Sequence, residues 1–174
     1  QAGEIGGAFF NEGGGIASVA TYVFSDRESA SDPAVLRSLK RADGIFLAGG
    51  DQSRYVRYWR GTPVGAALDA HVRAGKPLGG TSAGLAMQGE YLYGAMDGGS
   101  VISPHALADP LGPDNTIETD FLQLALLKGV ITDTHFSERN RLGRLIAFVA
   151  KAESLAGRPI LGLGVDEDAA VAVE

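Results

Sequence analysis

Short apolar segments that end directly at glycine or aspartate most restrict the fold of this chain. Residues 44–50 read Gly-Ile-Phe-Leu-Ala-Gly-Gly, and residues 129–133 and 160–165 follow a similar plan. Such runs are typical of buried strands followed by a tight loop. Segments with apolar residues at helical spacing lie between them. The alternation predicts an α/β domain, with a parallel-rich sheet flanked by helices.

The remaining elements are expected from local composition. Residues 1–18 are glycine-dense and favour no element, and residues 94–118 carry enough glycine and proline for a long excursion with turns. The β-branched and aromatic run at 19–24 predicts a strand, and 169–173 a further short one. Helices are expected over 34–41, 63–73, 85–93 and 120–127, and from Ser137 onward.

In a parallel sheet, functional loops gather at the carboxyl ends of the strands. Four loops follow apolar runs here, namely 49–52, 80–84, 133–138 and 166–168. We therefore look for the chemistry of the chain in these loops.

Ser82 is the first candidate. It lies in Gly80-Thr81-Ser82-Ala83-Gly84, a G-x-S-x-G motif between an extended segment and a helical one. On such a turn a serine is held in a strained backbone and exposes its Oγ, while the glycines let strand and helix pack closely. The N–H of Ala83 would then face a developing oxyanion. The simpler interpretation is a serine that caps a helix.

A serine nucleophile needs a base and a residue that orients the base. Of the three histidines, His71 falls inside an expected helix and His105 in the long excursion, whereas His135 follows a strand at the expected functional edge. The orienting acid is open among Asp133, Glu138 and the cluster 166–168. Asp133 and Glu138 are too near His135 in sequence to face its ring easily, which favours the cluster.

Composition excludes several classes of function. The chain has no cysteine, so disulfides and thiolate chemistry are ruled out, and its net charge of -6 argues against nucleic-acid or anionic-membrane binding. No apolar run is long enough to span a bilayer. We expect no cofactor and no metal. A homodimer is left open, and a cytoplasmic location is slightly favoured over secretion.

Four segments, "GGDQ", "GGTSAG", "DTHFSERNRLGRL" and "GLGVDEDAA", together resemble the cyanophycinase-like branch of peptidase family S51. The resemblance runs from about Ala42 to Val173. It implies a fold like class I glutamine amidotransferases (a flavodoxin-like three-layer arrangement) and a metal-free serine peptidase with the order Ser, His, acid. We expect one such domain over residues 1–174, truncated at one or both ends.

The resemblance also implies roles for individual residues. Ser82 would be the nucleophile, His135 the base and Glu167 the orienting acid, with Gly50 N–H as the second oxyanion donor. The implied substrate is an aspartyl peptide, or one like cyanophycin, with the β-aspartyl link favoured. Residues that would line its pocket are Gln52, Asp133, Thr134, Arg139, Arg141 and Arg144.

One departure bears on the substrate. The branch usually carries glutamine where this chain has Thr134, so strict preference for arginine in the substrate is not expected. Three rivals remain: an α-aspartyl dipeptidase, a non-catalytic binding module of the same family, and an α/β-hydrolase esterase. The esterase order is Ser, acid, His, which fits poorly because the candidate acid follows His135.

Overall fold

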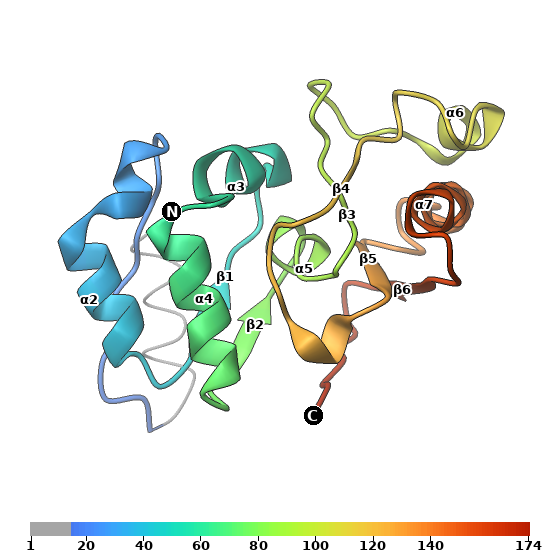
Figure 1. Cartoon of the computed structure of the whole chain (residues 1–174). Helices are drawn as coiled ribbons and strands as arrows, with labels where there is room; N and C mark the ends of the chain where they lie inside the picture. The colour runs from blue at the N-terminus through green and yellow to red at the C-terminus, as the bar shows by residue number, and fades with distance from the viewer. Residues whose placement is uncertain (1–14) are drawn as a thin grey trace.

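A computed structural model describes residues 15–174 of the protein (Figure 1). The helical segments are η1 (Glu28–Ser31, 3₁₀), α2 (Pro33–Arg41), α3 (Gln52–Trp59), α4 (Pro63–Arg73), α5 (Ala83–Ala86), α6 (Ser103–Ala108), η2 (Ala125–Leu127, 3₁₀) and α7 (Leu142–Ala156). The strands are β1 (Ile45–Leu47), β2 (Leu78–Gly80), β3 (Leu92–Tyr93), β4 (Ile117–Glu118), β5 (Val130–Thr134) and β6 (Leu161–Val165).

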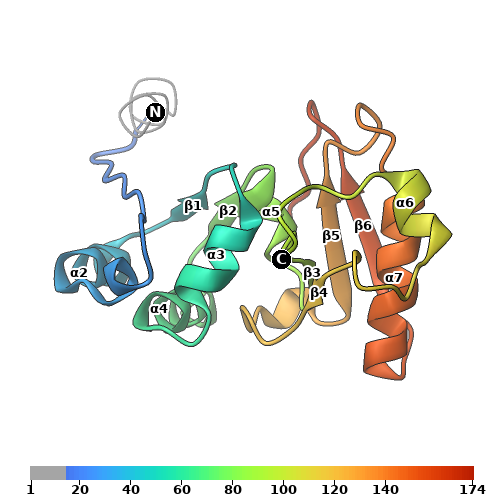
Figure 2. The same cartoon turned by 90° about the horizontal axis from the view of Figure 1, so that it is seen from above.

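The strands pair two by two, and two of the three pairs are parallel. β1 pairs with β2 and β5 with β6 in parallel, whereas β3 and β4 are antiparallel. A single parallel bridge, Tyr91 to Ile131, ties the segment before β3 to β5. Helices flank these strands in both views (Figures 1 and 2). The predicted α/β fold with parallel strands and flanking helices is confirmed.

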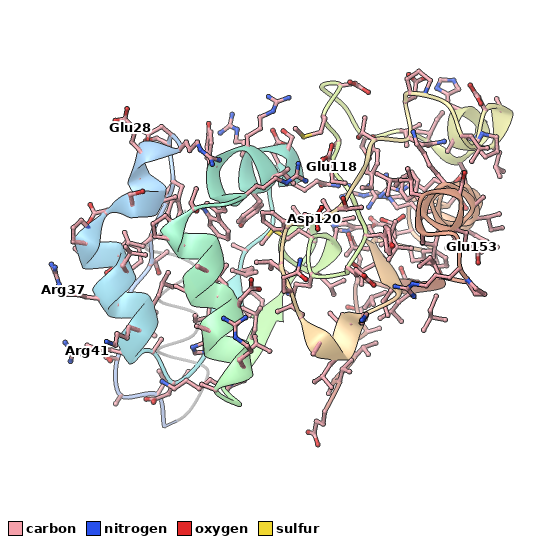
Figure 3. The ribbon with its side chains drawn as sticks, in the orientation of Figure 1. Glu28, Arg37, Arg41, Glu118, Asp120 and Glu153 are labelled. Atoms are coloured by element: carbon pink, nitrogen blue, oxygen red, sulfur yellow. The ribbon has the colours of Figure 1, made fainter. Side chains whose placement is uncertain are left out.

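Helices α2 and α4 pack against each other beside β1 and β2. Each begins with proline at a first-turn position, where its missing N–H costs nothing. The Asp32 carboxylate caps α2 through the N–H groups of Ala34 and Val35. Apolar side chains of α2, α3 and α4 form one core with Leu47 of β1, including Val35, Val56, Trp59, Val64 and Leu68. Arg37 and Arg41 point away from this body on α2 (Figure 3).

Helix α7 runs along β5 and β6, as Figure 2 shows. Its inner face places Leu145, Phe148 and Ala152 in a second core with Ile131 and Ile160. The helix comes this close because β6 carries Gly162, where an added Cβ would lie 2.8 Å from Cγ2 of Val149. This contact fixes the strand pair that carries two of the site loops.

Some local expectations are wrong. Residues 85–93 are not one helix: α5 ends at Ala86 and the chain turns into β3. Gly89 allows this turn, because a Cβ there would lie 2.6 Å from the Tyr91 carbonyl oxygen and 2.7 Å from that of Val130. The helix expected from Ser137 begins only at Leu142, after a series of turns.

The strands expected at 19–24 and 169–173 are also absent from the described residues, and only a short 3₁₀ turn falls within 120–127. β-propensity describes how well a side chain fits a half-buried pleated surface. Val23 is 76% exposed and pairs with no neighbouring strand in the described part of the chain, so the composition of this run does not suffice.

Within residues 15–174, no helix has both the length and the apolar character that a membrane crossing requires.

Candidate active site

Ser82 occupies the sharp turn between β2 and α5. Its backbone has φ 51° and ψ −122°, a conformation that non-glycine residues rarely adopt. The flanking glycines make the turn possible. A Cβ on Gly80 would lie 2.6 Å from the Gly84 carbonyl carbon, and one on Gly84 would lie 2.5 Å from that of Leu47. Ser82 is therefore on the kind of elbow that its motif predicts.

His135 follows the last residue of β5 and faces Ser82. Its Nε2 is 2.9 Å from Ser82 Oγ, and its Nδ1 is hydrogen-bonded to Oε1 of Glu167. The backbone of His135 is also left-handed, with φ 49°. Serine, histidine and carboxylate thus form a continuous hydrogen-bonded series, the geometry in which an imidazole can take a proton from a hydroxyl.

The sheet and helix contacts explain why these three side chains meet. Thr132 of β5 donates its hydroxyl to the carbonyls of Leu85 and Ala86 at 3.1 and 3.0 Å, which holds α5 against β5. Thr134 is paired with Val165 at the end of the parallel ladder. Because both strands end at the same edge, His135 and the 166–168 loop leave the sheet side by side.

The structure brings a second carboxylate to the ring. Glu138 Oε2 is 3.7 Å from His135 Nδ1, so the expectation that Glu138 lies too near in sequence to face the ring is wrong. The turn after His135 causes this, since Arg139 N–H donates to the His135 carbonyl at 3.1 Å. Residues three apart on such a turn share a face. That spacing was the signal that sequence reasoning missed.

The carboxylates around the ring influence each other. A hydrogen bond between Glu138 and Glu167 raises the pKa of Glu138 and, together with the bond to His135, lowers the pKa of Glu167. Hydrogen bonds from Ser137 hold the pKa of Asp166 below its usual value, and Ser137 N–H donates to Asp166 at 3.0 Å. Glu167 therefore keeps its negative charge opposite the imidazole.

The two expected oxyanion donors lie at the ends of two neighbouring loops. Ala83 N–H opens α5, and Gly50 lies after β1 with φ 138°. Among the described residues, neither N–H donates to a backbone or side-chain acceptor. A Cβ on the adjacent Gly49 would lie 3.0 Å from Ser82 Cβ, so this loop passes directly over the serine.

Two of the expected substrate-binding residues are instead paired with each other in the interior. Arg144 donates Nε and Nη2 to the Asp133 carboxylate at 2.7 and 2.5 Å, and both side chains are almost fully buried. The third guanidinium nitrogen, Nη1, donates to Ser100 Oγ and the Val101 carbonyl. All three nitrogens of Arg144 are thus engaged within the protein, which leaves this guanidinium poorly placed to capture a substrate carboxylate.

The other expected pocket residues differ in exposure. Arg141 is buried, donates to the Thr134 carbonyl at 2.7 Å, and has its pKa lowered to about 10, mainly by desolvation. Thr134 is buried too, whereas Arg139 is exposed. Gln52 begins α3 and donates to the Tyr93 carbonyl at 3.2 Å.

An open hollow of about 440 Å³ lies beside Glu167, lined by Ser137, Glu138, Asp166, Glu167, Asp168 and Ala169. Ligand-type atoms of His135, Glu138 and Glu167 lie within 4.8 Å of one another. His135 is hydrogen-bonded to both Ser82 and Glu167, so these side chains form a hydrogen-bonded cluster.

Comparison with known proteins points to one family. The family model "Peptidase family S51" matches residues 21–174. A cyanophycinase of Thermosynechococcus vestitus is 37% identical over 155 residues, which are 88% of this chain and 43% of that protein. A cyanophycinase of Trichormus variabilis is 35% identical over 150 residues, 86% of this chain and 45% of that protein.

A solved structure supports the fold. The crystal structure of a peptidase from an acI-B1 Actinobacterium matches with a TM-score of 0.51 at 20% identity, over 82% of this chain and 50% of that one. The chain spans less than half the length of each of these two curated relatives.

Proposed function

This chain belongs to peptidase family S51, and from that premise we propose that it is a serine-type, cyanophycinase-like peptidase that hydrolyses aspartyl peptides. The observation that carries the proposal is the series Ser82 Oγ, His135 and Glu167, closed by a 2.9 Å contact between Oγ and Nε2. The reaction would take place within one S51-type domain.

In the first half of the reaction, Ser82 Oγ attacks the scissile carbonyl while His135 Nε2 takes the hydroxyl proton. The Glu167 carboxylate stabilises the imidazolium that forms and keeps the ring oriented. The carbonyl oxygen, now an oxyanion, accepts hydrogen bonds from Ala83 N–H and Gly50 N–H. His135 then gives the proton to the leaving amine, and the acyl group stays on Ser82.

In the second half, water replaces the amine. His135 takes a proton from the water, the resulting hydroxide attacks the acyl-enzyme, and Ser82 leaves with the proton from Nε2. The strained backbone at Ser82 favours this chemistry because it keeps Oγ clear of the helix that follows.

We propose a β-aspartyl link as the favoured substrate bond. An aspartyl peptide carries free carboxylates, which arginine binds well. Since Arg144 is paired with Asp133 and Arg141 is buried, the exposed Arg139 is the better candidate for this contact. Thr134 offers a shorter side chain than glutamine, so arginine in the substrate is expected to be preferred by less than roughly 10⁴-fold.

Two other functions stay open. An α-aspartyl dipeptidase would use the same serine and histidine on an ordinary peptide link. A non-catalytic binding module would keep the pocket without turnover. The left-handed backbone at both Ser82 and His135 favours catalysis, because such strain costs stability and is typically found at functional sites.

A substrate panel tests the proposal. Release of amino acids is measured from β-Asp-Arg, β-Asp-Lys, β-Asp-Leu, α-Asp-Leu and cyanophycin, with wild type and Ser82→Ala. We expect turnover of the β-linked peptides by wild type alone, and labelling by a fluorophosphonate that Ser82→Ala abolishes. Faster cleavage of α-Asp-Leu would favour the dipeptidase, and neither turnover nor labelling would favour the binding module.

A further inference from the structure

Glu138 has no role in the reaction described so far, yet its carboxylate lies on the same side of His135 as that of Glu167. Its Oε2 is 3.7 Å from Nδ1, the nitrogen that Glu167 already contacts. Two carboxylates at this distance from one nitrogen repel each other unless they share a proton or face a cation. The His135 ring becomes such a cation each time it takes the proton of Ser82.

The local backbone holds Glu138 in this place. Arg139 N–H donates to the His135 carbonyl, and Arg141 N–H donates to that of Phe136 at 2.8 Å, which folds the turn back over the ring. On the other side, Asp166 accepts a hydrogen bond from Ser137 N–H. The turn is therefore tied at both ends, and Glu138 faces the ring although its side chain is 54% exposed.

We propose that Glu138 is a positioning residue, a second carboxylate that acts with Glu167 on Nδ1 to hold the His135 ring and stabilise its protonated form. This inference rests on the proposed function, since it concerns the base of that reaction. The interaction between Glu138 and Glu167 raises the pKa of Glu138 and lowers that of Glu167, which agrees with this role. When the two carboxylates hold one proton, that proton stays on Glu138 and Glu167 remains charged.

Other charged residues lie near Glu138 and must be controlled for in a test. Arg139 acts on both glutamates, and Asp166 and Asp168 line the same hollow. All three remain in a Glu138 variant, so the change in pH dependence reports Glu138 itself. Asp168→Asn is a matched control, because it removes one negative charge from the same hollow, whereas the carboxylates that contact Nδ1 are those of Glu138 and Glu167.

The test compares the pH dependence of kcat/KM for wild type, Glu138→Gln, Glu138→Ala and Asp168→Asn on the best substrate of the panel. Without the second carboxylate the imidazolium is less stable, so the acidic limb of the profile should move to lower pH. A unit charge at about 4 Å in solvent-exposed surroundings gives a shift of about 0.5 pH unit. We expect about 0.5 for both Glu138 variants, with kcat about 3-fold lower and KM unchanged, and clearly less for Asp168→Asn.

The shift of the acidic limb between the Glu138 variants and wild type should be smaller at roughly 1 M salt, where exposed charges are screened. Shifts in the Glu138 variants no larger than that of Asp168→Asn, or toward higher pH, would overturn the proposal. Glu138→Gln keeps the size of an exposed side chain, so its folding is not in question.

A second measurement separates this inference from the proposed function. The ring protons of His135, assigned by their loss in His135→Ala, are titrated by NMR in the same variants without substrate. A lower midpoint in Glu138→Gln than in Asp168→Asn supports Glu138 even if no peptide is cleaved, in which case only the proposed function fails. Equal midpoints overturn the role of Glu138 whatever the activity.

Discussion

For the substitution Gly84→Ala, helix propensity predicts a gain in stability and tertiary packing predicts a loss. Gly84 lies inside α5, where alanine is favoured over glycine by about 1 kcal/mol. However, a Cβ there would lie 2.5 Å from the Leu47 carbonyl carbon and 2.7 Å from the Ala48 carbonyl oxygen. Both are backbone atoms next to a paired strand, and neither can rotate away.

The steric clash of the added Cβ with the backbone should outweigh the higher helix propensity of alanine. Real Cβ atoms essentially never come this close to backbone atoms, so α5 must move away from β1. Overpacking of a core typically costs about 1–3 kcal/mol. The upper end of this range, about 3 kcal/mol, less the gain of about 1 kcal/mol in helix propensity leaves a net loss of about 2 kcal/mol in the free energy of unfolding. A loss of this size lowers the Tm by about 4–8 °C. The shift also moves Ser82 relative to the Gly49-Gly50 loop, so kcat should fall by about 10-fold or more.

Urea unfolding followed by circular dichroism measures the loss. Gly99→Ala is the matched control, because Gly99 is exposed, no atom lies within 4 Å of the position that its Cβ would take, and the change should stay within about 0.5 kcal/mol. If Gly84→Ala is as stable as Gly99→Ala, or more stable than wild type, the close approach of α5 to β1 is not what requires glycine in the motif.

Three further substitutions test other parts of the structure. Ser82→Ala and His135→Ala should each remove nearly all turnover, and the double variant should be little worse than either; multiplying losses in single-turnover assays would contradict a shared mechanism. Asp133→Asn should lower the free energy of unfolding, measured in urea, by about 3–5 kcal/mol because it leaves Arg144 buried without its ion-pair partner. Adding Arg144→Met should recover part of this loss, and additive losses would argue against a stabilising Arg144–Asp133 pair. The pKa of Asp166 lies below its usual 3.8, so the stability that its carboxylate contributes is complete above pH 3.8 and is lost as the pH falls through the lowered pKa. Asp166→Ala and wild type should therefore differ in urea midpoint at pH 7 and converge at acidic pH, and a difference that does not change with pH would exclude the carboxylate as its cause.

The sequence by itself determined the elements whose signals are local. Helices α2 and α4 were expected over 34–41 and 63–73, and the strands β1, β5 and β6 over the apolar runs 44–50, 129–133 and 160–165. All five were predicted to within three residues at their ends. Ser82 was singled out by its G-x-S-x-G motif between an extended and a helical segment, and His135 by its place after a strand at the edge where parallel strands end. The glycines around Ser82 already indicated a turn that only small residues permit.

The sequence indicated helix where the tertiary structure demands something else. Residues 87–93 have the composition of a helix. However, a Cβ at position 89 would clash with the carbonyls of Tyr91 and Val130, and the chain leaves α5 to bridge with β5. Residues 137–141 were expected to begin a helix and instead fold into the turn that returns Glu138 to His135. Helical periodicity carries no information about a strand that arrives from elsewhere in the chain.

The partners of the charged residues were decided only by the tertiary structure. From the residues alone the acid was left open within the cluster 166–168, and only the family resemblance implied Glu167. The pairing of Thr134 with Val165 is what brings Glu167 beside the ring. Arg144 and Asp133 are eleven residues apart, on α7 and β5, and nothing in their spacing distinguishes a buried ion pair from two pocket residues. Charge is a property of a residue, whereas desolvation and pairing depend on what the fold packs around it, so these contacts follow from the packing of α7 on the sheet.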